Sequence, residues 1–148
     1  MIFMKYISKS LAETEQIAKD YIEKNFKPTG AGALVVALQG DLGSGKTAFT
    51  KLVLKLLGME ENVTSPTFVI EKIYKIKHPE FEELVHIDAY RLTGVHELKT
   101  IGWDELIKDP KKIILVEWPE MIPDAFDGVE KRILFDFISE NERGIEIL

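Results

Sequence analysis

The stretch from Gly40 to Thr47, which reads Gly-Asp-Leu-Gly-Ser-Gly-Lys-Thr, constrains the fold of this chain more than any other feature. It matches the pattern G-x-x-x-x-G-K-[ST] at every fixed position. Glycines allow the backbone to turn tightly enough to direct its N–H groups at a phosphate. In such a loop the Lys46 ammonium reaches the outer phosphates, and the Thr47 hydroxyl binds the accompanying Mg²⁺. We therefore predict a phosphate-binding loop made of Gly40, Asp41, Leu42, Gly43, Ser44, Gly45, Lys46 and Thr47.

The residues on either side of this loop predict the secondary structure that a phosphate site requires. Residues 33–38 are an apolar run rich in branched side chains, which is typical of a buried parallel strand. After the loop, apolar residues recur at helical spacing until Gly58, which marks the predicted end of a helix. The N-terminus of that helix adds partial positive charge to the loop. The alternative, an ordinary glycine-rich turn before a helix, accounts less well for motif and context together.

Composition narrows the class of protein. The chain has 148 residues, 45% of them apolar and 30% charged, which fits one soluble globular domain spanning residues 1–148. No apolar run is long enough to span a bilayer, and the first residues do not resemble a signal peptide. The lack of cysteine suits the cytoplasm, where we expect the protein to reside. A net charge of −6 argues against a broad nucleic-acid-binding face, so we expect a partner to hold any RNA.

The remaining pattern predicts an α/β fold. A capping box formed by Ser10 and Glu13 begins an amphipathic helix, whose predicted face comprises Leu11, Thr14, Ile17, Ala18, Tyr21 and Ile22. A weaker helical stretch covers 95–107. Strands are predicted at 2–7, 33–38, 68–77, 83–88, 113–116, 131–138 and 144–148, with 68–77 and 83–88 joined as an antiparallel hairpin. These elements predict a P-loop NTPase-like three-layer domain with a mixed, mainly parallel sheet.

Two of the predicted strands end in a carboxylate. Residues 83–88 end at Asp88, and the apolar run 113–116 is followed by Glu117. A phosphate-loop enzyme places its second metal-binding group at such a strand end. Spacing alone does not rank the two carboxylates, and each taken singly could be an ordinary surface residue. His86 shares a strand face with Asp88 and is predicted to pack or to orient a neighbour, and Trp118 is predicted to pack in the core.

A loop of hydroxyl side chains follows the predicted nucleotide-binding helix. Thr64, Ser65 and Thr67 surround Pro66, which favours an extended backbone at the residue before it. The segment is either a connecting turn or a switch loop that senses the γ-phosphate or its Mg²⁺. The residues alone leave both interpretations open.

Four blocks of sequence resemble one family. These are Gly-Asp-Leu-Gly-Ser-Gly-Lys-Thr, Thr-Ser-Pro-Thr-Phe, His-Ile-Asp-Ala-Tyr-Arg-Leu and Val-Glu-Trp-Pro-Glu. In this order and spacing they resemble the TsaE family, the small bacterial ATPases of tRNA threonylcarbamoyladenosine synthesis. The resemblance spans nearly the whole chain, and the four blocks together are far more specific than the phosphate loop alone.

The resemblance implies roles for the matching positions around the phosphates. Residues 42–47 would wrap the phosphates of ATP, and Thr47 would hold Mg²⁺. Glu117 would be the second metal ligand, partly through water, and Asp88 would be the catalytic or metal-orienting carboxylate. Thr64, Ser65 and Thr67 would belong to the switch loop.

The resemblance also implies contacts to the rest of the nucleotide, and partners. Thr14 would lie near the adenine, although the N-terminal block matches the family least well, and Arg143 would touch the nucleotide. The partners would be a threonylcarbamoyl transferase subunit and its paralogous companion, which modify the adenosine beside the anticodon. Contact with tRNA would be indirect, through that complex.

The residues themselves favour ATP hydrolysis over transfer to a small acceptor. No long arginine-bearing lid is evident, since Arg91 and Arg143 are isolated in the sequence, and no Asn-Lys-x-Asp guanine reader is present. A site without an arginine finger is expected to hydrolyse ATP slowly until a partner completes it. The predicted function is a partner-stimulated, Mg²⁺-dependent ATPase. The alternatives are a small-molecule kinase and a nucleotide-sensing binding module.

Overall fold

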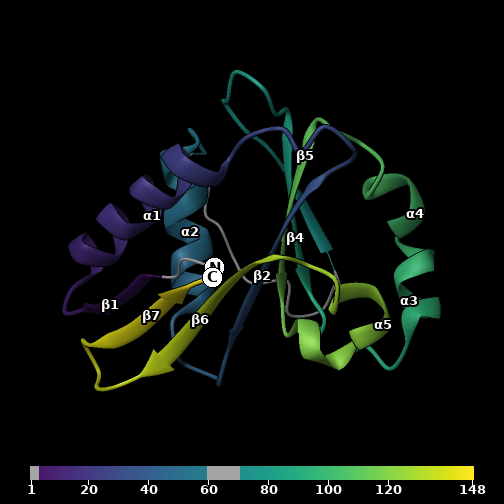
Figure 1. The fold of residues 1–148 in the computed structure, drawn as a ribbon. Helices are drawn as coiled ribbons and strands as arrows, with labels where there is room; N and C mark the ends of the chain where they lie inside the picture. Colours follow the sequence, from purple (N-terminus) through teal and green to yellow (C-terminus); the bar gives the residue numbers. More distant parts are fainter. Residues whose placement is uncertain (1–3, 60–70) are drawn as a thin grey trace.

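The computed structural model describes residues 4–59 and 71–148, which form a sheet with helices on both faces (Figure 1). The strands are β1 (Met4–Ser8), β2 (Leu34–Gly40), β3 (Glu71–Lys75), β4 (Glu83–Asp88), β5 (Lys112–Glu117), β6 (Lys131–Phe137) and β7 (Arg143–Ile147). The helices are α1 (Leu11–Asn25), α2 (Lys46–Leu56), α3 (Val95–Thr100), α4 (Trp103–Leu106) and α5 (Pro123–Phe126), with a 3₁₀ turn η1 (Pro119–Met121). No helix in the described ranges is both long and apolar enough to cross a membrane.

The seven strands lie in the order β1-β7-β6-β2-β5-β4-β3. β2 is central and parallel to both β5 and β6, and β4 is parallel to β5. The outer strands pair antiparallel: β3 with β4, β7 with β6, and β1 with β7. The mixed sheet and the β3–β4 hairpin are therefore confirmed, and β1 and β3 are the edge strands of the sheet that the structure describes.

Two hydrophobic clusters make the layers on either side of the sheet. One joins α1 and α2 to the sheet and includes Tyr21, Phe49 and Phe135. The other joins α3, α4 and α5 to the opposite face and includes Leu98, Trp103 and Phe126. Figure 1 shows α1 and α2 together on one side of the sheet and the three shorter helices on the other. The predicted three-layer α/β architecture is confirmed.

The first helix begins at the predicted cap, with a small difference. The Ser10 hydroxyl accepts a hydrogen bond from the Glu13 N–H at 3.1 Å, and the Glu13 carboxylate accepts one from the Lys9 N–H at 2.6 Å. In a capping box the Glu13 carboxylate would accept from the N–H of Ser10 itself, whereas here it accepts from the residue before Ser10. Leu11, which the spacing places on the apolar face of this helix, is 60% exposed, and the buried stripe starts one turn later, at Thr14.

The predicted helix over 95–107 is two short helices. Gly102 separates α3 from α4 with a φ of +78°, a left-handed conformation that suits a residue without a Cβ. The helix after the phosphate loop ends as predicted. There the Met59 N–H donates to the Leu54 carbonyl at 2.9 Å, and the Gly58 N–H donates to the Lys55 carbonyl at 3.1 Å.

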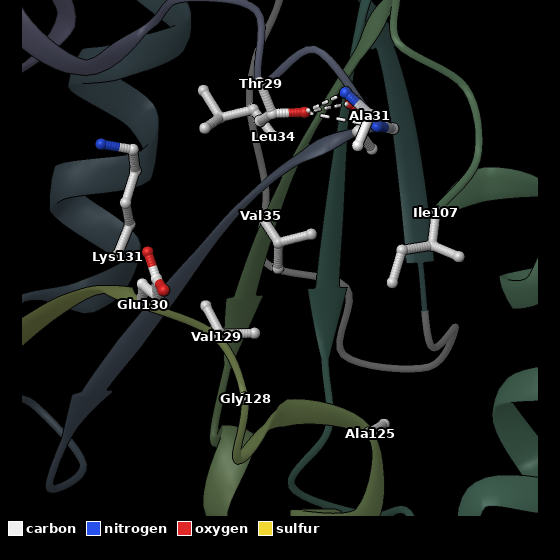
Figure 2. A pocket seen from close by; sticks show the side chains of 12 residues that line it. Thr29, Ala31, Leu34, Val35, Ile107, Ala125, Gly128, Val129, Glu130 and Lys131 are labelled. Atoms are coloured by element: carbon white, nitrogen blue, oxygen red, sulfur yellow. Dashed lines mark hydrogen bonds between the residues drawn. The ribbon is translucent and has the colours of Figure 1, made fainter.

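A cavity of about 440 Å³ lies at the N-terminal end of β2, between the loop that precedes β2 and the residues that precede β6 (Figure 2). Its walls are mainly apolar and include Leu34, Val35, Ile107 and Val129. This cavity is at the start of β2, whereas the predicted phosphate loop follows the end of β2, so the two lie at opposite edges of the sheet.

Candidate functional site

A second cavity, of about 330 Å³, lies at the opposite edge of the sheet, where β4 and β5 end and α2 begins. It gathers most of the residues that the sequence predicts for the site, together with two that it does not. The lining residues are Leu42, Gly43, Ser44, Gly45, Lys46, Thr47, Ala48, Asp88, Glu117, Trp118 and Arg143. The phosphate loop, two strand-end carboxylates and a distant arginine therefore face one space.

The loop from Gly40 to Thr47 joins β2 directly to α2. Its turn is closed by a hydrogen bond from the Ser44 N–H to the Asp41 carbonyl oxygen at 3.1 Å. Gly40 is packed so closely that an added Cβ would lie 2.5 Å from the Phe135 carbonyl oxygen and 2.6 Å from the Ser44 hydroxyl. Gly40 and Asp41 support the loop from outside the cavity lining, and the Asp41 side chain is exposed.

Lys46, the first residue of α2, is 5% exposed. Its ammonium donates a hydrogen bond to the Gly40 carbonyl oxygen and lies 3.6 Å from the centroid of the Trp118 ring. Burial lowers the pKa of Lys46, and the nearby carboxylates, led by Glu117, oppose that shift.

Trp118 follows β5 and faces the cavity. The core packing predicted for it holds only in part, since the residue is half-buried. Its ring is tilted against that of Tyr90, with centroids 4.9 Å apart, and lies under the Lys46 ammonium. Its backbone is left-handed, with φ of +59°, which is uncommon for a bulky residue and clusters at functional sites. The available signal in the sequence was its position directly after the strand-end carboxylate.

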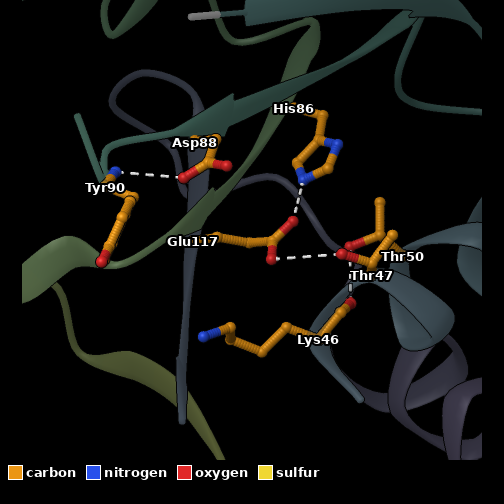
Figure 3. Close-up of polar contacts among 7 residues, drawn as sticks. All are labelled: Lys46, Thr47, Thr50, His86, Asp88, Tyr90 and Glu117. Carbon is orange, nitrogen blue, oxygen red and sulfur yellow. Dashed lines mark hydrogen bonds and ion pairs between the residues drawn. The ribbon is translucent and has the colours of Figure 1, made fainter. Parts of the chain in front are cut away.

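Glu117 is the last residue of β5 and is 3% exposed. One carboxylate oxygen, Oε1, is 3.5 Å from the Thr47 hydroxyl, and the other, Oε2, is 2.5 Å from Nε2 of His86 (Figure 3). Strand alternation explains the contact between His86 and Glu117. On β5, Glu117 lies on the same face as Leu115, which packs toward α2. On the adjacent parallel strand β4, His86 lies on that face too, between Leu84 and Asp88. The buried carboxylate is therefore fixed between the start of α2 and β4.

Asp88 lies opposite Glu117 in the parallel register of β4 and β5. It is half-buried, and its Oδ1 accepts a hydrogen bond from the Tyr90 N–H at 3.0 Å (Figure 3). The two carboxylates, which spacing alone does not rank as metal-binding candidates, therefore have different surroundings. Glu117 adjoins the Thr47 hydroxyl, whereas Asp88 accepts a hydrogen bond from the backbone of Tyr90.

Arg143 begins β7, far from the loop in sequence but close to it in space. A Cβ added to Gly45, whose φ is +114°, would lie 2.5 Å from the Arg143 Nη1. Arg143, which is isolated in the sequence, lies beside the loop in the folded chain because β7 pairs with β6 and β6 with β2. Sequence alone could not supply that strand order.

Thr14, which the resemblance places near the adenine, is not in the lining of this cavity. Thr14 is fully buried in α1, where its hydroxyl is 2.7 Å from the Ser8 hydroxyl and 3.2 Å from the Ser10 carbonyl oxygen. The predicted switch residues Thr64, Ser65 and Thr67 fall outside the described residues.

The chain is similar to known proteins along most of its length. Residues 8–145 match the family model described as "Threonylcarbamoyl adenosine biosynthesis protein TsaE". The protein named tRNA threonylcarbamoyladenosine biosynthesis protein TsaE in Rickettsia prowazekii is 38% identical over 114 residues, covering 76% of this chain and 72% of the relative. The protein of that name in Borreliella burgdorferi is 35% identical over 123 residues, covering 83% and 84%.

A solved structure has the same fold. The crystal structure of Bacillus subtilis YdiB superposes with a TM-score of 0.69 and 28% sequence identity, covering 99% of this chain and 84% of YdiB. The family match takes in the phosphate loop, both strand-end carboxylates and Arg143. The chain therefore belongs to the TsaE family of threonylcarbamoyladenosine biosynthesis proteins.

Proposed function

We propose that this protein binds ATP with Mg²⁺ in the 330 Å³ cavity and hydrolyses ATP in support of the threonylcarbamoyl modification of tRNA. Its family takes part in tRNA threonylcarbamoyladenosine biosynthesis. The observation that carries the proposal is the convergence of Lys46, Thr47 and Glu117 at the N-terminus of α2. A cation, a hydroxyl and a carboxylate at a helix N-terminus are the groups that a phosphate-loop nucleotide site uses.

Buried polar atoms without partners support the binding of phosphate. The Ser44 hydroxyl and the Arg143 Nη1 are buried and have no hydrogen-bond partner among the residues that the structure describes. Leaving such groups unpaired costs about 1–3 kcal/mol each, more when they are charged. An anion in the cavity would satisfy both, and the N–H groups of the loop would add to its binding.

The donor set also suits Mg²⁺ held with a nucleotide. Among the described residues, no cluster of three or more His, Cys, Asp or Glu side chains could hold a metal ion by itself. Mg²⁺ in nucleotide sites needs only one or two protein oxygens, because phosphates and water complete its octahedron. Thr47 and Glu117 would be those ligands, and when bound the ion would neutralise charge on the phosphates.

Three further residues of the chain would each have a role in ATP hydrolysis. Lys46 would move from the Gly40 carbonyl and the Trp118 ring to the outer phosphates, where its charge opposes the negative charge that develops during hydrolysis. Asp88, held at the rim by the Tyr90 N–H, would orient the attacking water. Arg143, beside Gly45, would add positive charge from within the same chain.

The resemblance to the TsaE family supports two partners, a threonylcarbamoyl transferase subunit and its paralogous companion. The net charge of −6 makes direct, extensive tRNA binding unfavourable, so tRNA would be reached through those subunits. A cytoplasmic location is part of the same proposal.

The test is ATP hydrolysis with Mg²⁺, by the protein alone and with both transferase subunits. Wild type, Lys46→Ala and Glu117→Ala are compared. We expect the subunits to stimulate wild-type turnover and both substitutions to abolish the stimulated rate. Equal, low turnover with and without the subunits would contradict the proposal and leave a nucleotide sensor. Turnover that requires a small acceptor instead would indicate a kinase.

A further inference from the structure

His86 is a fully buried polar side chain to which the proposed reaction assigns no part. It lies on β4, is 1% exposed, and faces α2 between Leu84 and Asp88. Burial of an imidazole is costly unless its polar atoms are hydrogen-bonded. Its one hydrogen bond among the described residues is made by Nε2 to the Glu117 carboxylate, and its Nδ1 has no partner there. Among the described residues, the His86 side chain therefore forms its hydrogen bond with Glu117 alone.

The direction of this bond follows from the chemistry of the pair. An ionised carboxylate can only accept, so the hydrogen is carried by His86 Nε2. The bond is 2.5 Å long and joins two side chains that are each at least 96% buried. His86 faces Leu115 in the strand register, so it reaches Glu117 diagonally, from the neighbouring strand.

The bond with His86 engages only one of the two oxygens of the Glu117 carboxylate. Oε2 is occupied by His86, whereas Oε1 points toward the Thr47 hydroxyl, 3.5 Å away (Figure 3). A glutamate side chain has several rotatable bonds, and the Lys46 ammonium is a nearby charge that favours pairing with it. Without a partner on Oε2, the carboxylate could rotate toward that ammonium.

We propose that His86 is a positioning residue: by donating to Oε2, it holds the Glu117 carboxylate so that Oε1 and the Thr47 hydroxyl face the same Mg²⁺ position. This inference rests on the proposed Mg²⁺–ATP function of the cavity. Outer hydrogen bonds of this kind orient metal ligands, and their loss typically weakens metal binding by about 10- to 100-fold.

The test measures metal binding directly. Mn²⁺ is titrated against the protein with bound ADP, and its affinity is read from the electron paramagnetic resonance signal of free Mn²⁺. ADP affinity is measured separately in EDTA, and unfolding by urea reports stability. The variants are His86→Phe, which keeps a ring but removes the donor, and His86→Gln, whose amide nitrogen can reach the place of Nε2.

Thr50→Val is the matched control. Thr50 is also fully buried on this side of the sheet, and its hydroxyl donates to the Lys46 carbonyl within α2, away from Glu117 (Figure 3). The substitution removes a buried hydrogen bond at nearly constant volume, so it reproduces a general loss of stability. We expect it to leave the Mn²⁺ affinity unchanged.

For His86→Phe we expect the Mn²⁺ affinity to fall about 10- to 100-fold, while the ADP affinity in EDTA stays unchanged. For His86→Gln we expect a Mn²⁺ affinity close to that of wild type. If His86→Phe does not fold, His86→Asn replaces it, because its shorter amide cannot reach Glu117. Wild-type Mn²⁺ affinity in the donor-lacking variant, or equal loss in the glutamine variant, would overturn the role of His86 alone. Failure of wild type to bind Mn²⁺ with ADP would overturn the proposed function as well.

Discussion

The Lys46 ammonium lies 3.6 Å from the centroid of the Trp118 ring and donates a hydrogen bond to the Gly40 carbonyl oxygen. A cation over an indole face gains about 0.5–2 kcal/mol, more when both are desolvated. The lysine that a phosphate loop uses for its nucleotide is thus occupied by protein groups. Nucleotide binding must therefore exchange these contacts for phosphate oxygens.

The first prediction concerns the fluorescence of Trp118. In the proposed site the ammonium would leave the indole when phosphates bind, so we expect ADP or ATP to change the tryptophan emission of the protein. The chain has two tryptophans, so Trp103→Phe and Trp118→Phe separate their signals. Trp103 lies outside the cavity lining and packs on Phe126, with ring centroids 5.3 Å apart. The change should persist in Trp103→Phe and disappear in Trp118→Phe; the reverse pattern would refute the exchange.

The second prediction separates the two carboxylates. Glu117 adjoins Thr47, whereas Asp88 is held at the rim by the Tyr90 N–H. We expect Glu117→Gln to weaken Mn²⁺ binding to the ADP complex by roughly 100-fold, since the proposed ligand would be at least as important as its supporting residues. Asp88→Asn should keep Mn²⁺ affinity within a few-fold but reduce ATP turnover, by about 100-fold or more. Equal loss of Mn²⁺ binding in both variants would mean that both carboxylates bind the metal.

The third prediction concerns Arg143, whose Nη1 adjoins Gly45 and has no hydrogen-bond partner in the described part of the chain. Hydrogen bonds to charged groups contribute about 1.5–3 kcal/mol, so we expect Arg143→Ala to weaken ATP binding by roughly 10- to 100-fold. Arg91→Ala removes the same charge from an exposed side chain outside the cavity and should leave ATP affinity nearly unchanged. Calorimetric titration measures both, and equal effects would indicate only a general influence of net charge.

The fourth prediction uses two glycines that line the apolar cavity at the opposite edge of the sheet (Figure 2). A Cβ added to Gly32 would lie 2.1 Å from the Ile107 carbonyl oxygen, whereas one added to Gly128 would meet nothing within 4 Å. We expect Gly32→Ala to lower the free energy of unfolding by about 1–3 kcal/mol, because backbone must shift. Gly128→Ala should be neutral or raise that free energy by up to about 1 kcal/mol. Urea unfolding compares them, and equal stability would contradict the close packing at Gly32.

The sequence predicted the parts of the fold that local patterns determine. The apolar run before Gly40, the helix after it and its end near Gly58 each follow from residues adjacent in the chain. The break in the helix 95–107 has a local cause too, because Gly102 takes a left-handed backbone between the two short helices.

Other features depend on neighbours that are distant in the chain. Arg143 reaches Gly45 only because β7, β6 and β2 are successive neighbours in the sheet. His86 meets Glu117 because β4 and β5 pair in one particular parallel register. Periodicity assigns a residue to a face of its own strand, but it does not say which strand lies beside it. The contacts among the predicted site residues therefore required the structure.

The most direct test of the account is an equilibrium titration of ATP against wild type and Lys46→Ala, with Mg²⁺ and with EDTA. We expect wild type to bind ATP more tightly with Mg²⁺ than with EDTA, and Lys46→Ala to lose roughly 10- to 100-fold in affinity. That result would establish the cavity beside Trp118 as a Mg²⁺–ATP site. ATP affinity that neither the removal of Mg²⁺ nor the loss of the lysine changes would contradict it.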